Sequence, residues 1–129
     1  MKKALIYDPY LDTLGGGERY VLSFASALTD LGYDTYLAWN DEDILQEAGK
    51  RFGQNYSSLK VSKQAYQNCL GRPSLIQKYQ YQKNFDLIFW VSDGSLPFLF
   101  GKKNLLHLQV PFTNLGENGL FSSIKKIFI

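Results

Sequence analysis

Residues 3–39, KALIYDPYLDTLGGGERYVLSFASALTDLGYDTYLAW, decide the fold. The apolar run at 4–7 ends at an acid and a proline, which is typical of a strand buried on both faces of a parallel sheet. After the glycine-rich loop, apolar residues recur at spacings of three and four up to residue 31, and Gly32 can cap the helix that this spacing predicts. A second apolar run covers 35–39. Strand, helix and strand in this order predict a right-handed βαβ unit, so the sheet should be parallel.

The rest of the chain continues this alternation of strands and helices. The sequence predicts, in order, a helix capped by Asn40 or Asp41 and ending near residue 52, a strand at 59–62, a helix at about 73–83, and strands at 86–91 and 104–110. The segment 63–72 has no clear periodicity. We therefore expect one α/β domain over residues 1–129, with an open, mainly parallel Rossmann-like sheet and helices on both faces. Its site should lie at the carboxyl ends of the strands.

Composition excludes several classes of protein. A hydrophobic fraction of 45% and a charged fraction of 20% are those of an ordinary globular domain. The formal net charge of +2 is too small to indicate a nucleic-acid track. Cys69 is the sole cysteine, so an intrachain disulfide is excluded and a cytoplasmic location is favoured. No apolar run is long enough to span a membrane, but residues 121–129 are apolar enough for a peripheral location at the inner membrane surface as an alternative.

The loop Gly15-Gly16-Gly17-Glu18 is the first candidate site. Glycines before a helix let backbone N–H groups approach an anion, and the helix dipole favours negative charge there. We therefore assign these four residues to phosphate binding, with a plain turn as the alternative. The loop is not a dinucleotide fingerprint, because Tyr20 stands where the third glycine is needed.

Polar residues near the ends of the last two strands form the second candidate site. His107 and Gln109 are two apart on a predicted strand and should share a face, and Asp93 follows the preceding strand. Ser92, Gly94 and Ser95 flank Asp93 and offer hydroxyls and amides to an acceptor. His107 is the sole histidine, so a histidine metal cluster is excluded. The acids at 41–43 are interpreted as helix-capping residues, so no metal is assigned.

The order of several segments resembles the start of the family-four glycosyltransferases of GT-B fold. The resemblance rests on Lys3-Ala4-Leu5-Ile6-Tyr7-Asp8, Gly15-Gly16-Gly17-Glu18-Arg19-Tyr20-Val21-Leu22, Ala27-Leu28, Gly32-Tyr33-Asp34 and the strands at 86–92 and 104–111. It covers about the first 112 residues. It implies an amino-terminal, acceptor-side domain, and a second domain that holds a nucleotide-sugar donor.

The resemblance also implies roles for individual residues. Gly16 and Gly17 would donate amides to the donor diphosphate, and Asp93 and Gln109 would face the acceptor or the transferred sugar. Many members have a histidine at the position of Gln109, so His107 is an alternative for that role. The nucleotide-sugar is a substrate, and no cofactor or metal is implied.

Nothing after Ile129 supplies the second domain, so we expect a fragment, a truncated frame or one subunit of a split enzyme, incomplete after about residue 112. Two other functions stay open: a stand-alone acceptor-binding or regulatory subunit of a split glycosyltransferase, and an unrelated phosphate-binding α/β domain. As partners we expect the two substrates and the missing domain, and no nucleic acid. The apolar residues after Pro111 also predict a homo-oligomer.

Overall fold

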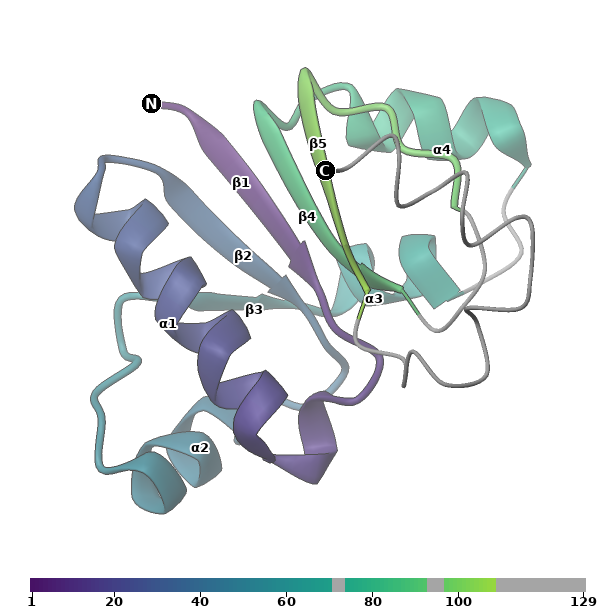
Figure 1. Cartoon of the computed structure of the whole chain (residues 1–129). Coiled ribbons are helices and arrows are strands. Elements are labelled where there is room, and N and C mark those ends of the chain that lie inside the picture. The colour runs from purple at the N-terminus through teal and green to yellow at the C-terminus, as the bar shows by residue number, and fades with distance from the viewer. Residues whose placement is uncertain (71–73, 93–96, 109–129) are drawn as a thin grey trace.

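The computed structural model describes residues 1–70, 74–92 and 97–108. In chain order the elements are β1 (Lys3–Tyr7), the 3-10 turn η1 (Leu11–Thr13), α1 (Gly16–Asp30), β2 (Asp34–Ala38), α2 (Ile44–Phe52), β3 (Lys60–Ser62), α3 (Lys63–Leu70), α4 (Leu75–Gln82), β4 (Leu87–Ser92) and β5 (Lys103–Leu108). The strands form one sheet in the order β3-β2-β1-β4-β5, and every pair is parallel. The predicted open parallel α/β fold is confirmed (Figure 1).

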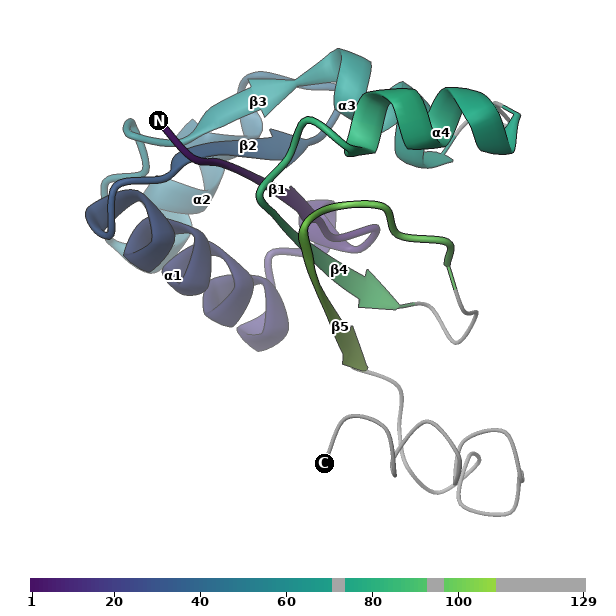
Figure 2. The same ribbon diagram turned by 90° about the horizontal axis from the view of Figure 1, so that it is seen from above.

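Helices cover both faces of the sheet (Figures 1 and 2). The centre of the sheet is buried: Ala4, Leu5 and Ile6 of β1 have no exposed surface. Alternate side chains of β1 therefore enter different cores. Ala4 and Ile6 pack with residues of α1 and α2, while Leu5 packs with residues of α3.

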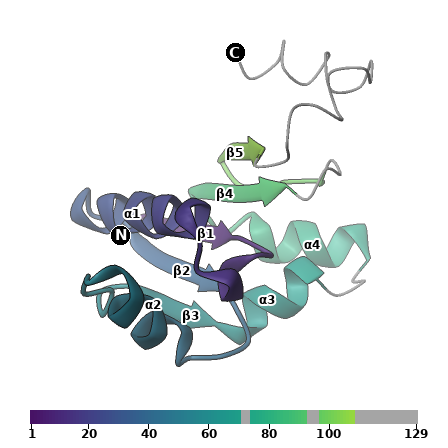
Figure 3. The same cartoon turned by 60° about the horizontal axis from the view of Figure 1, so that its bottom comes forward.

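Helix α1 starts beside the carboxyl end of β1 (Figure 3). Its buried apolar residues are Val21, Leu22, Ala25 and Leu28, whereas Leu31, the last residue of the predicted spacing, is exposed. The helix ends at Gly32, whose φ of +97° is one that glycine adopts without strain. The N–H groups of Gly32 and Tyr33 donate to the carbonyls of Thr29 and Leu28, as in a Schellman cap. This cap turns the chain back toward β2.

Two helices differ from the sequence prediction, and the end of one predicted strand lies outside the described residues. Helix α2 begins at Ile44, and Asp41 does not cap it; instead, Asp41 accepts the Asp43 N–H in the turn before the helix. Helix α3 occupies the segment that had no clear pattern, and the buried pair Ala65 and Cys69 holds it on the sheet. The description of β5 ends at Leu108, so the predicted residues 109 and 110 lie outside it. No helix among the described residues is both long and apolar enough to cross a bilayer.

Candidate functional site at the glycine loop

The glycine loop lies at the carboxyl edge of the sheet, where the sequence predicted it. Gly15 precedes α1, and its N–H donates to Glu18 Oε2 at 3.0 Å. Glu18 is only 5% exposed, so its side chain belongs to the loop and does not face solvent. The role of Glu18 in this structure is thus to hold the loop. Gly16 begins the helix, and nothing lies within 4 Å of the position that a Cβ would take there. A ligand therefore has access to the Gly16 backbone.

Three cations surround the outer side of this loop. Arg19 of α1 and Lys50 and Arg51 of α2 line a hollow of about 730 Å³ together with Gly15 and Gly16. Arg51 is fixed there, because its Nε donates to the Leu14 carbonyl at 3.0 Å. Among the described residues none of the three cations forms an ion pair, although Glu47 lines the same hollow. Unpaired cations beside a helix N-terminus favour an anion.

A stack of three rings lies on the other side of the loop. The His107 ring lies between Tyr20 of α1 and Phe89 of β4, with ring centroids 5.4 Å and 5.8 Å away and interplanar angles of 27° and 24°. A second hollow, of about 460 Å³, is lined by Gly17, Tyr20, His107 and Leu108. The loop thus connects two hollows, one next to cations and one next to an aromatic stack.

Burial lowers the pKa of His107. We expect its ring to titrate below the ordinary value of about 6.5 and to be neutral at about pH 7.5. Because the chain has one histidine, NMR titration of the imidazole signals reads this pKa directly. Tyr20→Ala should uncover the ring and raise the pKa toward the ordinary value, while Tyr20→Phe should leave it low. A wild-type titration above about pH 7 would contradict the expectation.

Asp8 is a buried acid at the same edge. It follows β1, is 2% exposed, and its Oδ1 accepts the Tyr10 N–H at 2.9 Å. Among the residues that the structure describes, its Oδ2 has no hydrogen-bond partner. Burial, opposed by the Tyr10 N–H and reinforced by the charges of Glu18 and Asp12, raises the pKa of Asp8 to about 6. The carboxyl can therefore gain or lose a proton near neutral pH.

Only some of the residues assigned from sequence can be placed. The ring of His107 stacks on the ring of Tyr20 in α1, and His107 lines the same hollow as Gly17. Ser92 is fully buried at the end of β4, opposite Leu108. Asp93, Gly94, Ser95 and Gln109 lie outside the described residues. Their predicted roles at the acceptor therefore stay predictions.

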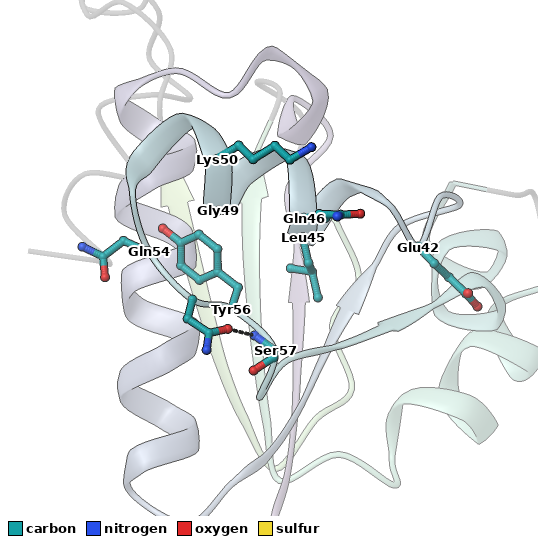
Figure 4. A pocket seen from close by; sticks show the side chains of 9 residues that line it. Glu42, Leu45, Gln46, Gly49, Lys50, Gln54, Tyr56 and Ser57 are labelled. Carbon is teal, nitrogen blue, oxygen red and sulfur yellow. Dashed lines mark hydrogen bonds between the residues drawn. The ribbon is translucent and has the colours of Figure 1, made fainter.

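Another hollow lies away from the loop (Figure 4). It has a volume of about 510 Å³, and its walls are α2 and the segment 54–57. Its lining includes Gln46, Gln54 and the bond from the Ser57 N–H to Asn55 Oδ1 at 3.0 Å. Tyr56, in its wall, is buried, and its hydroxyl has no hydrogen-bond partner in the described part of the chain. None of the residues assigned from sequence lines it.

Sequence reasoning missed Asp8, Tyr20 and the three cations as members of the site. Asp8 was interpreted as the end of a strand, and a buried acid has the same sequence pattern as an exposed one. Tyr20 is separated from His107 by most of the chain, and the cations come from two helices. Asp8, Arg19 and Tyr20 belong to segments that carry the resemblance, but no pattern in those segments gave their side chains a role.

Among the described residues, no three side chains of histidine, cysteine, aspartate or glutamate are grouped in a way that could hold a metal ion. Comparisons of the chain with protein-family models, with curated proteins and with solved structures found no match.

Proposed function

We propose that this chain is the acceptor-side domain of a glycosyltransferase that uses a nucleotide-sugar donor. One observation carries this function: the glycine loop has a hollow lined by cations that form no ion pair within the described residues on one side, and a hollow lined by His107 on the other. A diphosphate needs the first environment, and a sugar or another hydroxyl-bearing acceptor suits the second. Sugar transfer requires the donor diphosphate and the acceptor to lie next to each other.

The anionic part of the donor would bind the loop through its backbone and its cations. The first N–H groups of α1 have no partner within the helix, so they are available to phosphate oxygens. Arg19 can add a forked contact, and Lys50 a point charge. These groups would stabilise the charge that develops on the leaving diphosphate. Hydrogen-bond donors and cations that are already in position commonly contribute to catalysis in this way.

His107 would contact the acceptor or the transferred sugar. Its pKa lies below the ordinary value because it is half buried, so the ring carries one donor and one acceptor nitrogen at neutral pH. The rings of Tyr20 and Phe89 restrict its orientation. A neutral, oriented imidazole can accept a hydrogen bond from a sugar hydroxyl.

An NMR titration of the ¹⁵N-labelled chain with pyrophosphate, UDP and UDP-glucose tests the donor site. We expect shifts centred on Gly15, Gly16, Gly17 and Arg19, with a dissociation constant weaker than about 10 μM, because such enzymes hold the nucleotide mainly on a second domain. Arg19→Ala should weaken pyrophosphate binding about tenfold, the loss expected of a charged hydrogen bond. Lys103→Ala, at the opposite edge of the sheet, is the matched control and should change nothing.

Two results would contradict the proposed function. The first is the absence of any shift at the loop up to about 20 mM pyrophosphate, which corresponds to less than about 3 kcal/mol of binding. The second is an equal loss of affinity in Arg19→Ala and Lys103→Ala, because that would indicate a nonspecific charge effect.

A further inference from the structure

Two buried carboxyl groups lie between the end of β1 and the first turn of α1. Asp8 is 2% exposed and Glu18 is 5% exposed. Glu18 comes from the first turn of α1, and it raises the pKa of Asp8 through its charge, as does Asp12 of η1. Both charged neighbours that act on Asp8 are thus acids. The hydrogen-bond donors that these carboxyls have are backbone N–H groups, from Tyr10 to Asp8 and from Gly15 to Glu18.

The backbone just before the loop is strained. Leu14 has a φ of +47° and a ψ of +44°, the left-handed conformation that is unfavourable for a leucine. Two contacts flank this residue: Arg51 Nε donates to the Leu14 carbonyl at 3.0 Å, and the Gly15 N–H donates to Glu18 Oε2 at 3.0 Å. Strain of this kind persists only where the surroundings hold it. Losing the Glu18 contact would therefore allow the loop to relax.

We propose that the proton on Asp8 sets the conformation of the glycine loop. With the proton present, Asp8 is neutral, and the Glu18 carboxylate stays on the Gly15 N–H. When Asp8 loses the proton, its negative charge adds to that of Glu18, and the bond from the Gly15 N–H to Glu18 opens, because opening it lets the adjacent Leu14 relax. Leu14 then leaves its left-handed conformation. The glycine loop is thus a proton-sensitive element at the candidate site.

The switch is a property of the chain itself, and only its effect on a ligand rests on the proposed function. Because the pKa of Asp8 is about 6, the change should occur between about pH 5 and pH 7. An anion at the loop should bind less well above this range, since it would meet one more negative charge.

Hydrogen exchange of the Gly15 amide, corrected for its intrinsic pH dependence, tests the switch without any ligand. We expect the protection factor in the wild-type chain to fall about tenfold between pH 5 and pH 7.5. A tenfold change corresponds to a coupling of about one pKa unit between the Asp8 proton and the opening of the loop. Asp8→Asn removes the titrating group and should reduce the fall to less than about twofold. Glu18→Gln keeps an oxygen that can accept from Gly15 and removes the charge, so it should also abolish the fall. Asp12→Asn, which changes an exposed neighbour of Asp8, should retain the fall in protection.

An unchanged protection factor across this pH range in the wild type would overturn the switch. So would a fall of the same size in Asp8→Asn and Glu18→Gln. Titration with sulfate, which stays doubly charged throughout, tests the link to the site separately: we expect sulfate to bind about tenfold more weakly at pH 7.5 than at pH 5. A wild-type chain that shows the exchange change but binds no sulfate would retain the switch and would contradict the proposed function.

Discussion

Asp8→Asn is expected to stabilise the folded chain by about 3 kcal/mol at about pH 7.5, which corresponds to a rise in melting temperature of about 10 °C. Burial raises the pKa of Asp8 from 3.8 to about 6, so the folded chain prefers the neutral carboxyl. The stabilisation that the neutral form gives is complete below the unfolded value, and it is lost as the pH rises through the folded value. Asparagine has nearly the same shape and remains neutral at every pH.

Urea unfolding of wild type and Asp8→Asn at several pH values measures this difference. The two chains should have similar stability at about pH 4, and the difference should grow up to about pH 7. Apart from Glu18 and Asp12, whose charges act on Asp8, the acids titrate alike in both chains, so their contributions cancel. Asp12→Asn is the matched control, because Asp12 is exposed in the same loop, and its effect should stay within about 0.5 kcal/mol. A loss of stability in Asp8→Asn at pH 7.5 would show that Asp8 has a partner for its charge.

The sequence predicted the sheet because strong local patterns agreed with the tertiary arrangement. β1, α1 and β2 begin and end within about two residues of their expected positions, since the buried run at 4–7, the helical spacing and Gly32 act locally. Helix α3 could not be predicted in this way. Its buried face is small, with Ala65 and Cys69 as its buried members, so periodicity gave little signal. Packing against the sheet, and not the helix propensity of the segment, accounts for this helix.

The candidate site was predictable only where its residues lie close together in sequence. The glycine loop and its place at the carboxyl edge follow from one strand, one loop and one helix. The stack of Tyr20, His107 and Phe89 joins three elements, and its existence depends on β5 pairing with β4. The buried state of Asp8 depends likewise on how α1 packs, and the sequence alone gives no measure of that packing.

The expected behaviour of Gly16→Ala separates a ligand-binding loop from a plain turn. The φ of Gly16 is not positive, and an added Cβ would meet nothing within 4 Å. Alanine should therefore be tolerated at the start of α1 and should stabilise the fold by about 0.4 to 1 kcal/mol through the unfolded chain. If a diphosphate lies against this backbone, the same methyl group should obstruct it. We expect pyrophosphate affinity to fall at least about tenfold and, if the proposed function holds, turnover in an active transferase to fall about 100-fold for Gly16→Ala or Gly17→Ala.

Gly32→Ala is the matched control for Gly16→Ala, because Gly32 ends the same helix at a φ of +97°. Alanine in that conformation should destabilise the fold by at least about 1 kcal/mol and leave pyrophosphate affinity unchanged. The two variants should thus show opposite patterns in thermal melts and in NMR titrations. Gly16→Ala with full affinity and a normal melting temperature would identify the loop as a turn only. Such a result would argue against phosphate binding in the outer hollow, where Arg19, Lys50 and Arg51 form no ion pair with any residue that the structure describes.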